Sequence, residues 1–419
     1  MIQFDSFKNN DSKLSRISML LLALYPLLDW YEIPFSLSLG STLILCLSTF
    51  IIAYCRFKIN VLPASFLIVF LYVSIVWYTR HNYELWAIFP PGGWLFFLFC
   101  MSVISGTITL DVKSLQKFMK YIVWLSILLF WIQFIKIQIT GVNICFVPNL
   151  TGKFTYEYLT YNELVSRHII STHPCSIFLE KSYMAYYLST YLTIVLFGPK
   201  RKERWWNKEV IIICITLAFL RSGSGIISMI LLLLIKTLNS FWNSNITRGI
   251  ILIAFSLPIL IGTFWVYSRL ETGSEVLERR NEVFTEGTSG YGRVFAGYVM
   301  FGTQEFSEKM WGTMKQNLVD EYGYHKGDDK VLYINGVQTI LITLGYVGMA
   351  IYYLFFYYLF RGVTSLGRMS IIVLLIMALL ESNYLNPYMT LLTTIPCGLW
   401  YYNRSIQQKC RCFHGEKIP

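Results

Sequence analysis

Arginines from separate parts of the chain are the side chains best suited to bind a multiply charged anion. They are Arg167, Arg221 and Arg293. Arg221 lies in Phe-Leu-Arg-Ser-Gly-Ser-Gly between two apolar runs, where an arginine is unfavourable unless an anionic partner is present. Ser222, Ser224 and the glycines beside them allow backbone amides to turn toward an anion. We therefore expect a pyrophosphate site, although a snorkelling arginine at a tight turn also explains Arg221.

The other two arginines have equally simple alternatives. Arg167 precedes His168 in a polar segment, so it is either a surface charge or a ligand. Arg293 follows Ser-Gly-Tyr-Gly and opens an expected amphipathic helix that includes 295–306. A solvated arginine on a helix face is the alternative to a phosphate ligand there.

Two titratable side chains are candidate catalytic groups. Glu180 leads into an apolar run, where a carboxylate at the lip of a membrane helix could accept a proton or pair with an arginine. The preference of acids for helix N-termini explains it as well. His325 is the only histidine of a long polar segment and a second candidate base, although lone exposed histidines rarely have that role. Asn335 and Gln338, at the start of a later run, could bind substrate or cap the helix.

The cysteines give only weak evidence for a metal site or a disulfide. Cys410, Cys412 and His414 lack a second pair of zinc ligands, so we expect no metal and no cofactor. Cys145 and Cys175 fall in one expected external loop, where they could form a disulfide or remain free thiols.

The elements that must position these residues are apolar helices. Of the 419 residues, 55% are hydrophobic and 14% are charged, against roughly a quarter charged in a soluble domain. This composition predicts an all-α, polytopic bundle of about 12 spans that forms one membrane domain over residues 1–419. The candidate spans are 17–34, 37–55, 61–78, 85–106, 119–138, 182–198, 209–221, 225–238, 249–267, 336–360, 370–384 and 387–402. Pro90-Pro91 and the glycines after it should kink or break the fourth span.

The net charge of +11 sits in short clusters between apolar runs. This pattern favours membrane orientation over nucleic-acid binding, because cytoplasmic loops carry the excess of lysine and arginine. With twelve spans, the basic clusters all fall in loops on the same side of the membrane. That side is expected to be the cytoplasm, and both termini lie there. Two long polar segments, 139–181 and 268–335, then lie outside. Segment 268–335 is too polar to lie in lipid, and its aromatic residues argue against disorder.

Together these motifs resemble the O-antigen polymerase and ligase superfamily of bacterial envelope proteins, the Wzy type in particular. Phe178-Leu179-Glu180-Lys181-Ser182 is similar to the family's Phe-x-Glu-Pro-Ser, with a lysine in place of the proline. Arg221 to Gly225 resembles its Ser-Arg-Thr-Gly turn, and Gly292-Arg293 its Gly-Arg helix start. At the helix after the large loop, Asn335 matches His-Asn-x-x-Leu, but Ile334 stands in place of the histidine.

The resemblance implies a GT-C-like helical membrane fold, with 139–181 and 268–335 as periplasmic loops. It implies a glycosyltransferase of the inner membrane that makes O-antigen or capsule. An undecaprenyl-pyrophosphate-linked glycan would be transferred to a second lipid-linked repeat, the arginines would hold the pyrophosphate, and no nucleotide or metal would be needed. Membrane lipid and a chain-length regulator protein are the further expected partners.

Other classes remain open at the level of sequence. The missing histidine disfavours the ligase branch that joins glycan to the lipid A core. A flippase or transporter usually has two similar halves with short loops, and no internal repeat is visible. A purely structural subunit would not need several arginines at one membrane face.

Overall fold

The computed structural model describes residues 3–80, 89–155, 159–198, 207–242, 284, 288–313, 324–326, 329–331, 334–380 and 387–413. Nearly all of these residues are helical, with two short hairpins, so the expectation of an all-α membrane protein is confirmed. The candidate span 249–267 and most of the loop 268–335 lie outside the described residues.

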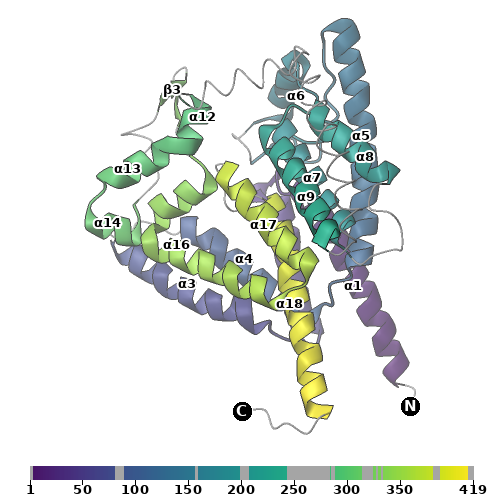
Figure 1. Cartoon of the computed structure of the whole chain (residues 1–419), viewed down its shortest axis with the longest axis vertical. Helices are drawn as coiled ribbons and strands as arrows, with labels where there is room; N and C mark the ends of the chain where they lie inside the picture. The colour runs from purple at the N-terminus through teal and green to yellow at the C-terminus, as the bar shows by residue number, and fades with distance from the viewer. Residues whose placement is uncertain are drawn as a thin grey trace.

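Helices occupy the other candidate spans (Figure 1). They are α1 (Gln3–Leu28), α2 (Leu39–Tyr54), α3 (Val61–Arg80), α4 (Phe89–Thr107), α5 (Val112–Thr140), α7 (Lys181–Phe197), α8 (Lys208–Phe219), α9 (Gly223–Trp242), α16 (Gly336–Gly362), α17 (Ser365–Leu380) and α18 (Pro387–Phe413). Within the described ranges, α3, α5 and α16 are long and apolar enough to cross a membrane, and several others are shorter apolar helices. The count of about 12 spans therefore stays a prediction.

The expected kink or break of the fourth span at Pro90 and Pro91 stays a prediction, because the part of the span before Phe89 lies outside the described residues. Helix α4 begins at Phe89, so both prolines lie in its first turn. Proline is tolerated there because the first amides of a helix have no acceptor within the helix.

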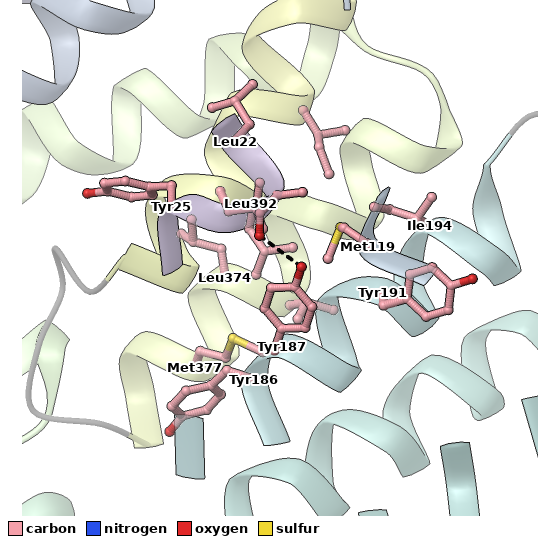
Figure 2. Close-up of a cluster of buried hydrophobic side chains, with 14 of the residues drawn as sticks. Leu22, Tyr25, Met119, Tyr186, Tyr187, Tyr191, Ile194, Leu374, Met377 and Leu392 are labelled. Atoms are coloured by element: carbon pink, nitrogen blue, oxygen red, sulfur yellow. Dashed lines mark hydrogen bonds between the residues drawn. The ribbon is translucent and has the colours of Figure 1, made fainter. Parts of the chain in front are cut away.

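Helix α7 forms the centre of the bundle. From Tyr183 to Phe197 all of its residues except Val195 are buried. Tyr187 donates a hydrogen bond of 2.9 Å to the Ala23 carbonyl on α1, within the cluster of large side chains shown in Figure 2. Helices α5, α8, α9, α17 and α18 also contact α7. The start of α7, where Glu180 lies, is thus fixed by packing on several sides.

Helices α7 and α9 run in parallel with a constant offset of 40 residues. Near their starts, a methyl group added at Gly225 would lie 2.7 Å from the Ala185 Cβ. Near their ends, the Lys236 Nζ donates to the Leu196 carbonyl and lies over the Phe197 ring. Glycine and alanine permit this close approach, as small residues do at other membrane helix interfaces.

The contact between α7 and α9 gives a first prediction. We expect Gly225→Val to destabilise the protein by about 1–3 kcal/mol, because it overpacks a closed interface. Gly223→Ala is the matched control, since a methyl group at Gly223 would meet nothing within 4 Å. Thermal unfolding in detergent measures both variants, and equal melting temperatures would contradict the proposed close contact.

The segment after α5 docks onto the hairpin between α1 and α2. Strands β1 (Glu32–Ile33) and β2 (Leu37–Ser38) form that hairpin. The Tyr31 hydroxyl donates to the Pro148 carbonyl at 2.7 Å, and the Glu32 amide donates to the Lys153 carbonyl at 3.1 Å. Helix α6 (Tyr161–Ile170) follows. These bonds join the segment to the bundle.

Beside α16 lie α13 (Gly297–Thr303) and α14 (Phe306–Trp311), which follow α12 (Ser289–Tyr291) and the π-helical turn η3 (Gly292–Ala296). A separate hairpin is formed by β3 (Tyr324–Lys326) and β4 (Asp329–Val331), near α12 (Figure 1). Helix α16 is broken at Gly345, which has a φ of 65°. The Thr313 amide donates to the Ile342 carbonyl at the break, with a bond of 2.8 Å. Gly312 and Gly345 meet there so closely that a side chain at either would clash with backbone.

The described start of α1 and end of α18 lie at the same end of the molecule (Figure 1). This is the arrangement expected if both termini share one side of a membrane.

Near the turn between α16 and α17, Arg361 lies against Tyr357, and Arg368 donates to the Phe360 carbonyl at 3.3 Å. Arginines that lie along aromatic rings at helix ends are typical of a membrane boundary.

Candidate functional site

The turn between α8 and α9 presents a cation next to an open helix start. Arg221 is partly buried and has a left-handed backbone, with a φ of 56°. Ser222 accepts from the Gly225 amide at 3.5 Å, and its hydroxyl lies 3.0 Å from that of Ser224. Gly223 is exposed, with open space where its side chain would be. The positive end of α9 and the Arg221 guanidinium are thus suited to bind a phosphate.

Glu180 and the Arg221 turn lie at the ends from which α7 and α9 begin. Glu180 precedes Ala185, which packs against Gly225, by five residues, about 7 Å along the α7 axis. Glu180 occupies the N-cap position of α7, but its side chain makes no capping hydrogen bond. Its Oε2 instead accepts from the Ser182 hydroxyl at 3.2 Å. Ordinary capping therefore does not explain this carboxylate.

Helix α6 lies against the entry to α7. A reciprocal capping box between Thr160 and Glu163 starts the helix. His168 is buried, and its Nε2 lies 3.0 Å from the Leu179 carbonyl oxygen, one residue before Glu180. Arg167, the next residue on α6, is exposed and interacts electrostatically with Glu163. The fold thereby brings the α6 arginine into the region of the α7 start.

A glutamine from α5 fixes the loop between α6 and α7. The Gln133 Oε1 accepts from the amides of Cys175 and Ser176, at 3.1 and 2.6 Å. The Cys175 thiol lies 3.6 Å from the His168 Nδ1. The disulfide considered for Cys175 and Cys145 does not form, since both are free thiols, and burial raises the pKa of each. Cys175 acts instead as a small buried group beneath the imidazole.

The buried imidazole makes stability depend on pH. Burial lowers the pKa of His168, with the Leu179 carbonyl and Glu180 acting in the opposite direction. As the pH falls below about 6.5, the unfolded chain takes up a proton that the folded chain resists, so the folded state loses stability. We expect His168→Gln to flatten this part of the melting-temperature profile between pH 7 and 5. A variant profile parallel to that of the native protein would contradict the assignment.

Arg293, Asn335 and Gln338 form a second group at the start of α16. Asn335 and Gln338 form a reciprocal capping box, with each side chain accepting from the other's amide, at 2.8 and 3.0 Å. The Asn335 Nδ2 also donates to the Arg293 carbonyl at 2.7 Å. Both side chains are buried, and capping accounts for the Asn335 amide and the Gln338 Oε1, whereas the buried Gln338 Nε2 has no hydrogen-bond partner among the described residues. Their bonds hold Arg293 in a π-helical turn, a feature frequent at functional sites.

The two groups lie on either side of α17. This helix contacts α7 and α9 on one side and α16 on the other (Figure 1). Arg167 and Glu180 thus lie near the start of α7, Arg221 lies at the start of α9, and Arg293 lies beside the start of α16. His325 lies on β3, paired in register with Lys330. No cluster of three or more metal-ligating side chains occurs within the described residues.

A family model described as WcaD colanic acid polymerase matches residues 20–397. The chain belongs to the WcaD colanic acid polymerase family. No curated protein matches the chain. The matched range includes all the candidate residues named above. Membership of the WcaD family confirms the resemblance to a Wzy-type polysaccharide polymerase, and it implies glycosyltransferase-type activity.

Sequence reasoning missed several residues that position the site. Gln133 lies well inside the apolar run 119–138, which is a visible signal of a buried role. Asp29 accepts from the amide and the hydroxyl of Ser41, and so caps α2 from the end of α1. For the Cys175–His168 contact no signal existed, because it depends on how the loop folds.

Proposed function

We propose that this protein elongates a surface polysaccharide at the periplasmic face of the bacterial inner membrane, where it acts on O-antigen-type or capsule-type repeat units. The donor is an undecaprenyl-pyrophosphate-linked glycan, and the acceptor is the non-reducing end of a second lipid-linked repeat. The observation that supports the proposal is the start of α9, with open space at Gly223 and Arg221 beside it, next to the helix α7 whose N-cap residue is Glu180.

In the proposed reaction, an acceptor hydroxyl attacks the anomeric carbon of the donor sugar. The bond from that carbon to the phosphate oxygen breaks, and the lipid pyrophosphate leaves with the electron pair. Glu180 accepts the hydroxyl proton, while Arg221, Arg167 and the first amides of α9 stabilise the negative charge on the leaving group. Ser222 and Ser224 shape that turn.

The second group is proposed to complete the site. Arg293 binds the same phosphates from the α16 side, and Asn335 and Gln338 act by holding its turn in place. His325 on the β3–β4 hairpin is the second candidate base. Both are tested by the same assay, with Arg293→Ala and His325→Ala compared at saturating donor.

The test is reconstitution of the purified protein with a defined lipid-pyrophosphate-linked repeat and no nucleotide. A ladder of longer products is expected, with one lipid pyrophosphate released for each linkage formed. Transfer only to a lipid A core acceptor would instead identify a ligase. Movement of the lipid-linked repeat across the bilayer without new linkages would identify a flippase.

A further inference from the structure

The helix after Arg293 is apolar on all sides. From Val294 to Phe301 the sequence is Val-Phe-Ala-Gly-Tyr-Val-Met-Phe, in which the Tyr298 hydroxyl is the only polar side-chain group. The expected amphipathic helix over 295–306 is therefore wrong for this part of the segment. A helix that is apolar all round is typical of a protein interior or a membrane.

One side of this helix is covered by protein. Ala296, Met300 and Phe301 are buried and pack in one cluster with Leu341 and Ile342 of α16. Gly297 lies against the Gln338 side chain so closely that a methyl group there would be 2.7 Å from it. This inner side includes only half of the residues from Val294 to Phe301.

The other side is exposed. Val294, Phe295, Tyr298 and Val299 have 42%, 40%, 45% and 59% of their surface accessible. Their spacing places them along one helix face that points away from the bundle. The segment is far shorter than the roughly 20 residues that a membrane span requires, so it cannot cross a bilayer.

The exposed face continues onto the outer surface of α16, one of the helices long enough to cross a membrane. The Phe301 ring packs edge-on against Tyr346 at 5.0 Å, and Tyr346 is itself 51% exposed. The phenol groups of Tyr298 and Tyr353 are close enough to interact electrostatically. Exposed tyrosines between an apolar face and a polar segment are typical of the membrane interface.

We propose that the outer face of η3 and α13 is immersed in one leaflet of the bilayer, in contact with phospholipid acyl chains, although the segment 268–335 as a whole is too polar to lie in lipid. The face is small, two helical turns, whereas a stable protein interface needs about 800 Å² on each partner. Polar residues follow directly on α14, where Lys309 donates to the Gly302 carbonyl at 2.7 Å. Arg293 at the start of the face is thereby held at the level of the lipid headgroups.

The test is photocrosslinking in nanodiscs of phosphatidylethanolamine and phosphatidylglycerol. Val299→p-benzoylphenylalanine should give a phospholipid adduct, detected by mass spectrometry, at least ten times more abundant than in the control. The control is Asn162→p-benzoylphenylalanine, at an exposed position of α6. Phe295→p-benzoylphenylalanine repeats the test on the same face if the first variant folds poorly.

Two outcomes would overturn the proposal. A crosslink between two chains at Val299 would show that a second copy covers the face. Adducts no more abundant than at Asn162 would show that the face is in water. Neither outcome depends on polymerase activity, so this test is separate from that of the proposed function.

Discussion

Arg221→Ala is expected to lower the rate of polymer formation about 100-fold or more, the loss typical when one preorganised donor to a developing anion is removed. Arg221→Lys should recover only part of the rate, because an ammonium is a point charge and cannot bind two phosphate oxygens side by side. The reconstituted assay with a lipid-pyrophosphate-linked repeat measures both rates.

Arg221→Gly separates charge from backbone conformation. Arg221 has a left-handed φ of 56°, which glycine adopts without strain, so the glycine variant should be at least as stable as the native protein. We expect it to fold and remain as inactive as Arg221→Ala. Arg368→Ala is the matched control, because that guanidinium donates to the Phe360 carbonyl near the turn between α16 and α17. A normal product ladder from Arg221→Gly would remove the proposed role.

Glu180→Gln is the second change with a large expected effect. The loss of a general base typically lowers the rate about 10²- to 10⁴-fold, and glutamine keeps the shape of the side chain without accepting a proton. The start of α7 should be unaffected, because Glu180 makes no capping hydrogen bond with its side chain. Initial rates at saturating donor, with melting temperatures for each variant, test this expectation.

Ser182→Ala serves as the control for Glu180. It removes the 3.2 Å hydrogen bond to the carboxylate without removing the carboxylate itself, so only a small loss of rate is expected. If Glu180→Gln retains full activity and His325→Ala does not, the base is on the β3–β4 hairpin. If both retain full activity, the proton leaves by another route and Glu180 has no catalytic role.

The helices could be predicted from the sequence because the signal is local. Three apolar runs became α3, α5 and α16, which are long and apolar enough to cross a membrane. The shorter runs within the described residues also became helices, and α1, α9 and α18 extend beyond them into polar sequence. The break in α16 was not predicted, since Gly345 lies in an unbroken apolar run and its conformation depends on contact with Gly312. The capping box that starts α6 was visible as Thr160-x-x-Glu163, but it was not recognised.

The sequence indicated the local motifs of the candidate site, but it could not indicate how the helices that carry them pack together. Arg221 has a left-handed backbone, the Ser222 and Ser224 hydroxyls lie 3.0 Å apart, and anion binding at this turn stays a prediction. The contact between the starts of α7 and α9 depends on the fit between Ala185 and Gly225, which no local pattern encodes. From the sequence, Asn335 and Gln338 could either bind substrate or cap the helix. Their burial and their reciprocal hydrogen bonds favour capping.

The interruption of α16 constrains how the protein is made. The Ile342 carbonyl is bonded by the Thr313 amide, which belongs to a segment that leaves the ribosome before α16 does. Until the two meet, the carbonyls freed at Gly345 need water, so the break cannot enter hydrocarbon unaccompanied. The 288–313 segment and the break in α16 therefore have to pack together for α16 to be accommodated in a bilayer.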